Sequence, residues 1–365
     1  MNRIYNSLIK SIGALALTGL AACDYIHDDS LEPCEYRLRL VYDYNMKFAD
    51  AFGHEVTKAA LFICDNKGNF IRRQDIEGAE LKANDIAMDL KPGTYQVLTW
   101  AGLDDSSYQW PELTPGSSTI EEIRVKTLRE ADATQPNELT PLWHALDTLV
   151  VTGDRHEEKE ISLAKNTNKL RVVLQDTEGY SMDVRDFSFR IVADNGYMDY
   201  DNALLDDPAI TYLPYHTESV DIAAGADDDD LINGKPANQY VAVAELNTMR
   251  LMAGENYRLI VRHKDWEDDV LNVNLNQYLL LTQMEGHNIS AQEYLDRQDE
   301  YSIVFFLTPI VCPDCPDPEP DPDPDPDPDP DPDPEIPDPD VPVVGYACYK
   351  IQVKDWVIRL NNGEL

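Results

Sequence analysis

The chain has 365 residues, which is too long for one ordinary domain and predicts two or three domains of about 150 residues. Its 68 acidic and 30 basic residues give a formal net charge of −38 at pH 7. Because such a surface repels phosphate backbones, we expect no nucleic-acid partner. Thirteen of the carboxylates fall in residues 314–340, so the remaining chain has the composition of an acidic but otherwise ordinary globular protein.

Residues 1–22 have the pattern of an export signal. Arg3 and Lys10 precede an uncharged run that is shorter than the roughly 20 residues of a membrane-spanning helix. Leu20-Ala21-Ala22-Cys23 has the form of a bacterial lipobox, which predicts a mature chain that begins at lipidated Cys23. The alternative is an ordinary signal peptide with a chance cysteine. On the lipobox interpretation, which we favour, residues 23–34 are a lipidated tether.

Alternation of apolar and polar residues with a period of two begins directly after the tether and predicts β-strands. Ala59–Cys64 and Asn69–Ile71, separated by a turn sequence, predict a β-hairpin. Ile86–Leu90 and Thr94–Trp100, joined by Lys91-Pro92-Gly93, predict a second hairpin. From Asp104 to Leu142 the alternation weakens into polar segments interrupted by prolines.

A second series of strands begins near Ile161. Its last members are predicted at Val270–Leu281 and Tyr301–Leu307. Between them, Ser290-Ala291-Gln292-Glu293 has capping-box spacing and predicts a short helix to about Arg297. Two runs of about seven strands predict an all-β fold with two tandem β-sandwich domains, at residues 35–160 and 161–311.

Residues 312–342 are a linker that contains Cys312-Pro313-Asp314-Cys315 and an Asp-Pro tract. Seven uninterrupted Asp-Pro copies run from Asp321 to Pro334. Proline fixes φ and the aspartates repel one another, which predicts a stiff polyproline-II rod. The carboxylates suit either a plain spacer with diffuse counterions, which we favour, or weak calcium binding.

Residues 343–365 predict a terminal strand. Ile351 and Val353 alternate, and Trp356, Ile358 and Leu360 alternate after a one-residue phase change at Lys354-Asp355, as at a β-bulge. A strand with an apolar face must be buried. It either completes the second sandwich, which we favour, or is donated to the sheet of a neighbouring subunit.

Removal of the first 22 residues leaves Cys23 for lipid and five further cysteines, an odd number. Cys64 lies inside an apolar strand and is expected to be a buried free thiol. Cys312 and Cys315 precede the Asp-Pro tract and Cys348 follows it, so we expect a disulfide between Cys348 and one of the other two.

The sequence contains none of the common catalytic motifs. It has no nucleophile elbow, P-loop or dinucleotide glycine fingerprint, and its histidines lack zinc spacing. Asp227–Asp230 suit a solvated loop better than a calcium site. We therefore predict a protein that is not an enzyme and holds no metal or cofactor. Five tryptophans leave open a carbohydrate-binding surface: Trp100, Trp110, Trp143, Trp266 and Trp356.

Several segments, in this order and spacing, resemble the FimB/Mfa2 fimbrial anchor family. Besides the lipobox cysteine, they are Ala59–Asp65, Leu90–Tyr95, Thr99–Gly102, Pro141–His144, Lys165–Val172, Asp199–Asn202, Gln292–Tyr301 and Trp356–Leu365. Together they cover most of residues 23–365. The Asp-Pro insertion departs from the family pattern.

The resemblance implies two tandem transthyretin-like sandwiches and a structural role at the base of a Bacteroidales fimbria. A member of this family attaches the shaft subunits to the outer membrane and influences fimbrial length. The acidic residues after Cys23 resemble the stretch that accompanies export to the outer leaflet in Bacteroidetes lipoproteins. We therefore expect a palmitate-bearing, surface-exposed lipoprotein of the cell outer membrane. The alternative is a carbohydrate-binding or adhesive surface lipoprotein.

Overall fold

The computed structural model describes residues 35–222, 239–281, 288–311, 343–353 and 356–359. The signal segment with Cys23, the Asp227–Asp230 run, the linker of residues 312–342 and Leu360 lie outside the described residues. What the sequence predicts for them stays a prediction.

The N-terminal half consists of two packed sheets. Alternate residues of both, such as Leu38, Leu61 and Val97, are fully buried and form one core between the sheets. The smaller sheet has the order β10-β1-β4, with β1 Tyr36–Val41, β4 Ile86–Met88 and β10 Glu157–Ser162. The larger has the order β11-β9-β5-β2-β3, with β2 Lys58–Asp65, β3 Phe70–Glu77, β5 Gly93–Ala101, β9 Trp143–Val151 and β11 Ala164–Lys165. Two short helices, α2 (Phe52–Glu55) and α3 (Gly78–Ala83), lie between strands.

The C-terminal half is a second pair of sheets. A six-stranded sheet has the order β16-β17-β12-β20-β21-β22, with β12 Thr167–Asp176, β16 His216–Asp221, β17 Tyr240–Met249, β20 Glu300–Val311, β21 Val343–Val353 and β22 Trp356–Arg359. Facing it is β19-β18-β13-β15-β8, with β8 Thr134–Gln135, β13 Phe187–Ala193, β15 Ile210–Tyr212, β18 Arg258–His263 and β19 Asp269–Asn274. Val172, Phe305 and Ile351 of the first sheet share a core with Ile191 and Leu259 of the second. Helices α4 (Leu275–Leu280) and α5 (Ala291–Arg297) and the 3-10 turn η2 (Val184–Asp186) complete this half.

The two halves exchange strands. The segment between β5 and β9 contains β6 (Tyr108–Gln109), the 3-10 turn η1 (Ile120–Glu122), β7 (Val125–Thr127) and β8. β8 pairs with β15 of the second half, and β14 (Tyr197–Met198) of the second half pairs with β7. The prediction of merely polar segments here is therefore incomplete. Tyr108, Ile120 and Leu142 are buried and belong to the same core as the second sandwich.

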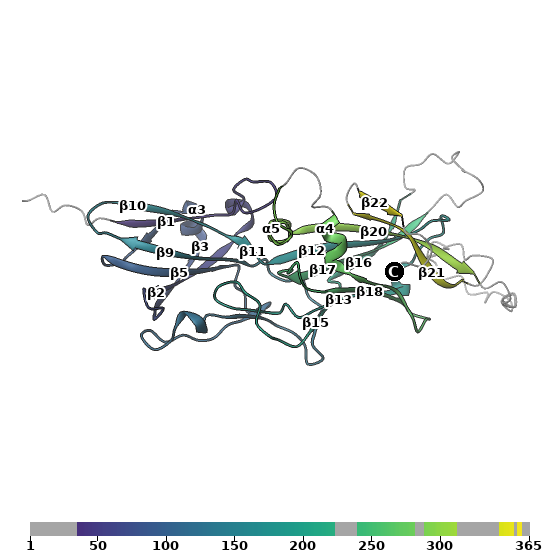
Figure 1. Cartoon of the computed structure of the whole chain (residues 1–365), viewed down its shortest axis with the longest axis horizontal. Helices are drawn as coiled ribbons and strands as arrows, with labels where there is room; N and C mark the ends of the chain where they lie inside the picture. Colours follow the sequence, from purple (N-terminus) through teal and green to yellow (C-terminus); the bar gives the residue numbers. More distant parts are fainter. Residues whose placement is uncertain (1–34, 223–238, 282–287, 312–342, 354–355, 360–365) are drawn as a thin grey trace, which may run out of the picture.

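The result is an elongated, mostly β molecule in which the sandwiches follow one another along the long axis (Figure 1). β1 begins at one end of this axis, and the long β20–β21 hairpin extends toward the other. The prediction of an all-β fold is confirmed. So are the hairpin of β2 with β3 and the short helix α5, whose N-cap Ser290 accepts a hydrogen bond from the Glu293 backbone N–H.

The predicted hairpin of Ile86–Leu90 with Thr94–Trp100 is wrong. β4 pairs with β1, whereas β5 pairs with β2 and β9 in the other sheet. The Lys91-Pro92-Gly93 turn therefore carries the chain across the sandwich. The reason is burial: Ile86 and Met88 fill the core between the sheets.

The predicted strand Val270–Leu281 is also only half right. The strand ends at Asn274, whose side chain accepts a hydrogen bond from the Gln277 backbone N–H at 3.4 Å and begins α4. Buried Leu275 and Leu279 are four residues apart, and this spacing places both on one helix face. An apolar run of this length does not distinguish strand from helix.

The C-terminal segment is not one strand with a bulge. Val353 of β21 is the partner of Trp356 of β22, so the chain reverses and the two strands form an antiparallel pair. The phase change at Lys354-Asp355 thus marks a reversal. The structure places Ile351 and Val353 in the core and Trp356 and Ile358 on the edge strand β22.

Candidate functional site

Four of the sequence segments that resemble the fimbrial anchor family meet where the two sandwiches join. The Asn166 side-chain amide donates to Asn202 Oδ1 at 2.5 Å. His144 Nε2 lies 2.8 Å from the Tyr200 carbonyl oxygen. Segments 141–144, 165–172 and 199–202 are therefore parts of one buried polar junction.

The fourth segment, residues 292–301, joins the same network through α5. Arg250 and Asp296 form two hydrogen bonds of 2.8 Å, and Gln292 also donates to Asp296. Lys165 Nζ bonds Glu55 of α2 at 2.9 Å and Asp299 at 2.5 Å, which links the two halves. These segments thus hold the two halves of the molecule together.

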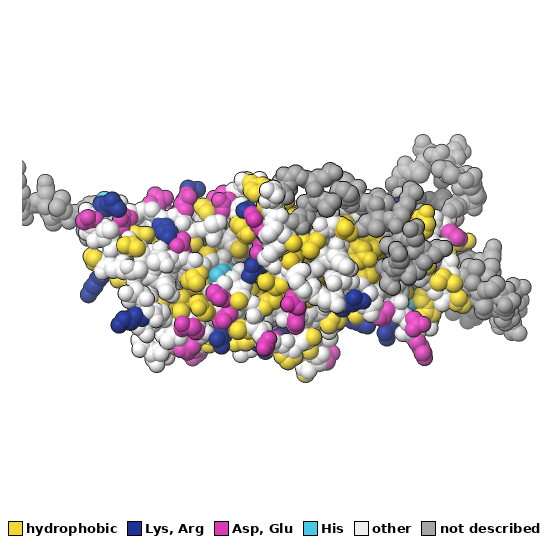
Figure 2. Space-filling view, viewed as in Figure 1, with side chains coloured by type: hydrophobic (Ala, Val, Ile, Leu, Met, Phe, Trp, Pro, Cys, Tyr) yellow, Lys and Arg dark blue, Asp and Glu magenta, His cyan; other side chains and the backbone are white. Residues whose placement is uncertain are grey.

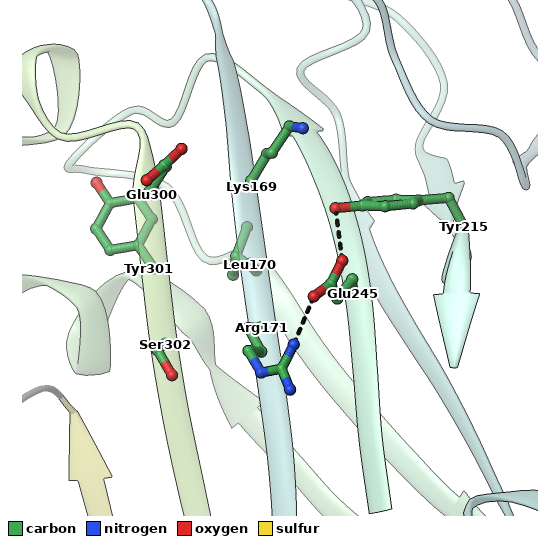
Figure 3. Close-up of a pocket in the computed structure, with 8 residues that line it drawn as sticks. All are labelled: Lys169, Leu170, Arg171, Tyr215, Glu245, Glu300, Tyr301 and Ser302. Atoms are coloured by element: carbon green, nitrogen blue, oxygen red, sulfur yellow. Dashed lines mark hydrogen bonds and ion pairs between the residues drawn. The ribbon is translucent and has the colours of Figure 1, made fainter. Parts of the chain in front are cut away.

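A pocket of about 430 Å³ lies next to this junction, on the six-stranded sheet. In the register of β12 with β20, Arg171 lies opposite Ser302 and Lys169 opposite Glu300. Figure 3 shows these side chains with Glu245 of β17 and Tyr215. Alternation along β12 explains the placement, because Leu170 and Val172 enter the core and Lys169 and Arg171 point outward.

Three of the four charged side chains of this pocket, those of Lys169, Arg171 and Glu245, are paired. Arg171 donates to Glu245 at 2.6 Å, and the Tyr215 hydroxyl donates to the other oxygen of Glu245 at 3.3 Å (Figure 3). Lys169 pairs with Glu138 at 2.7 Å. Burial, followed by the neighbouring Glu245, raises the pKa of Tyr215 to about 12. The phenol therefore stays neutral at physiological pH, which suits a surface for polar contact rather than proton transfer.

The C-terminal strands complete the six-stranded sheet at its edge. β21 pairs with β20 from Ile303↔Val353 out to Val311↔Val343. Val311 and Val343, the residues that flank the 312–342 linker, are therefore cross-strand partners. The described chain thus stops and resumes at neighbouring positions of the same sheet. β22 is the last strand of the sheet, and within the described residues it pairs only with β21.

The predicted cysteine roles have different outcomes. Cys64 is fully buried and free, as predicted, and burial raises the pKa of its thiol to about 12. Cys348 is half-buried opposite Leu307, its thiol is free in this structure, and burial raises the pKa of this thiol to about 12 as well. Its predicted partners Cys312 and Cys315 lie outside the described residues, so the disulfide stays a prediction.

The tryptophans do not line up on one sheet face. Trp100 and Trp143 are buried in the first half. Trp110 is half-buried beside Arg73, and Trp266 is half-buried in the second half, where it stacks on His263. The side chain of Trp356 is not described. An extended row of stacking platforms is thus absent from the described tryptophans.

The surface mixes both signs of charge. On the face shown in Figure 2, hydrophobic side chains gather over α4 and β12, while acidic and basic side chains are spread over the rest of the face. Among the described residues, no group of three or more His, Cys, Asp or Glu side chains is placed to hold a metal ion. No helix in the described ranges has the length and apolar composition to cross a bilayer.

Solved structures with a similar fold belong to bacterial proteins described as polysaccharide-binding, adhesive or fimbrial. A candidate polysaccharide-binding protein from Bacteroides thetaiotaomicron VPI-5482 is 31% identical, with a TM-score of 0.70, over 90% of this chain and 99% of that one. A candidate adhesin from the same strain is 29% identical, with a TM-score of 0.70, over 91% and 100%. The fimbrial anchor protein Mfa2 from Porphyromonas gingivalis shares the fold at 16% identity and a TM-score of 0.61, over 90% and 99%. None of the curated proteins matches the chain.

The fold and these likenesses define a fimbria-associated surface protein. The model of the fimbrillin-A associated anchor proteins Mfa1 and Mfa2 matches residues 31–362. The chain belongs to this family, as its resemblance to the FimB/Mfa2 anchors predicts.

Proposed function

We propose that this protein is a structural lipoprotein that anchors a fimbria to the cell outer membrane and limits the length of the fimbria. The observation that carries the proposal is the match of the anchor family to residues 31–362. The lipobox at Cys23 supplies the attachment, because several acyl chains on one residue provide the multiple signals that stable membrane binding needs.

The shape of the molecule supports an orientation with the first sandwich toward the membrane and the second toward the shaft. The described chain begins at one end of the long axis, where β1 starts, and the β20–β21 hairpin points toward the other end (Figure 1). A lipid on the segment before β1 would hold the first sandwich near the membrane. The second sandwich would then face the shaft subunits.

Strand pairing is the contact that we propose with the shaft. β22 is an edge strand, and an edge strand presents backbone N–H and C=O groups to a strand of another chain. Because β21 already fills the position beside β20, the chain needs no donated strand there. The protein would act through its own C-terminal strands and would carry no enzymatic activity.

The lipid attachment is tested by Cys23→Ala, with Cys34→Ala as the matched control outside the lipobox. We expect the Cys23 variant to leave the outer-membrane fraction, because it loses its acyl chains, while the control stays. Fractionation of whole cells with immunodetection measures this. An unchanged distribution of the Cys23 variant would show that the lipobox interpretation is wrong.

The role of the terminal strands is tested by deleting residues 343–365. This removes β21 and β22 and uncovers β20, so we expect the isolated protein to lose a cooperative unfolding transition or to aggregate. The control deletes residues 321–334, which shortens the linker and keeps both strands, and should melt as the wild type does. If the first variant melts unchanged while fimbriae detach from cells, the strands are donated to another subunit instead.

A further inference from the structure

A second pocket, of about 380 Å³, lies on the first sandwich. In the register of β2 with β3, Lys58 is opposite Glu77 and Ala60 is opposite Asp75. These four residues therefore share the sheet face that points away from the core formed with β1. The volume falls within the range of about 300–1,000 Å³ that is typical of small-molecule sites.

The walls of this pocket are held in place by ion pairs. Asp104 accepts from Lys58 Nζ at 2.6 Å and from the Ser106 backbone N–H at 2.9 Å. Arg73 donates to Asp75 Oδ1 at 2.7 Å, and its guanidinium carbon lies 5.6 Å from the centre of the Trp110 ring. Trp110 forms part of the lining.

Two carboxylates remain available for a ligand. Glu77 and Asp105 line the pocket and are exposed, and within the described residues their side chains make no hydrogen bond or ion pair. The ammonium of Lys58 uses one of its three protons on Asp104. Donor and acceptor groups thus lie side by side next to an indole ring.

This combination matches a sugar ring. A hydroxyl group both donates and accepts, so adjacent hydroxyls satisfy a carboxylate and an ammonium together. The apolar C–H face of a pyranose suits contact with an aromatic ring. Charge narrows the class of sugar, because the lining holds two cations, Lys58 and Arg73, against four carboxylates. The net negative pocket repels uronic and sialic acids.

We infer that this pocket is a subsite for a neutral pyranose of a surface glycan. Trp110 contacts the ring face, and Glu77 and Asp105 accept hydrogen bonds from its hydroxyls. The inference does not rest on the anchoring role, since the pocket lies on the first sandwich and away from the C-terminal strands.

The test is binding of neutral and acidic sugars to the full mature chain. The probes are mannose, galactose, glucose and N-acetylglucosamine with their short oligomers, against galacturonate oligomers and sialyllactose. Saturation-transfer NMR and titration calorimetry at millimolar sugar should show saturable binding of at least one neutral probe and none of the acidic probes.

Variants locate the site. Trp110→Ala should weaken binding about tenfold, in line with the loss of an aromatic contact. Because this change also removes the contact of Trp110 with Arg73, Glu77→Gln serves as a second variant and should weaken binding several-fold without lowering the melting temperature. Glu80→Gln, an exposed residue of α3 outside the pocket, is the control and should bind as the wild type does. The inference is overturned if no neutral probe binds, if acidic probes bind preferentially, or if binding is unchanged in Glu77→Gln.

Discussion

At the residue scale, buried polar side chains determine much of the local structure. Asn195 is fully buried, donates to the carbonyls of Met249 and Arg250 at 3.0 Å, and accepts from the Tyr212 hydroxyl at 2.8 Å. His144 is 6% exposed and packs edge-on against Trp100. Removal of one partner of a buried hydrogen bond, such as the one between Asn195 and Tyr212, leaves the other partner unsatisfied, which costs about 1–3 kcal/mol.

His144 should make stability depend on pH. Burial lowers its pKa from 6.5 to about 4, which the Tyr200 carbonyl partly opposes. A lowered folded-state pKa means that the unfolded chain binds the proton first. Neutral His144 therefore contributes on the order of 3 kcal/mol to the free energy of unfolding. This contribution is complete above pH 6.5 and is lost as the pH falls toward 4 and below.

Urea unfolding of the wild type and of His144→Gln between pH 4 and pH 7 measures this effect. We expect the difference in unfolding free energy between the two proteins to shrink as the pH falls, because acid effects on the carboxylates are common to both. Parallel stability curves across this range would contradict the assignment.

At the element scale, α5 is a short helix that depends on its cap and its packing. It has seven residues, and Tyr294 and Leu295 are buried while Ser290 caps the first turn. Isolated helices of this length are unstable in water, so tertiary contacts maintain it. The backbone carbonyl of Arg297 accepts a hydrogen bond from the Met46 backbone N–H, and the Arg297 guanidinium lies 4.0 Å from the centre of the Tyr44 ring.

Ser290→Ala should cost about 1 kcal/mol of unfolding free energy, because the Glu293 N–H loses its side-chain acceptor at 3.1 Å. Chemical denaturation measures the change. The control is Ser117→Ala, an exposed serine in a turn, for which we expect a change within about 0.5 kcal/mol. Equal effects of the two variants would mean that the cap contributes nothing specific.

At the scale of the whole molecule, the two sandwiches form one body. β8 and β14 each pair with a strand of the other half, and one hydrophobic core runs from Phe62 and Trp100 to Val172 and Phe305. Lys165 adds an ion-paired link that is 11% exposed. Strand pairs, a shared hydrophobic core and an ion pair all cross the interface between the halves. Local loss of these contacts should therefore destabilise both halves.

Lys165→Ala should lower the unfolding free energy by about 1–3 kcal/mol, since Glu55 and Asp299 lose their shared partner in a partly buried site. Calorimetry should show one transition at a lower temperature, not two. Lys169→Ala is the matched control, because its ion pair with Glu138 is exposed and worth at most about 1 kcal/mol. A separate early transition in the Lys165 variant would show that the halves unfold independently.

The sequence by itself determined the elements whose signals are local. Period-two alternation places β12 and β20, because opposite faces of a strand meet different surroundings. The apolar run Ala59–Cys64 and the turn sequence after it place the hairpin of β2 with β3. The capping residue Ser290 places α5, and Cys64 is buried because it lies within an apolar strand. The order of weak motifs indicates the family that the whole-chain match supports.

Tertiary structure decided which strands pair and which polar groups meet. The sequence of a turn does not show whether it closes a hairpin or crosses the sandwich. For this reason the prediction that the Lys91-Pro92-Gly93 turn closes a hairpin is wrong. The pairing of β8 with β15 joins residues 134–135 to residues 211–212. Both strands are too short to show a period-two alternation of apolar and polar residues in the sequence. The Trp110 pocket likewise combines β2 and β3, which share one register, with the segments that follow β5 and β6, and these parts of the chain come together only in the folded protein.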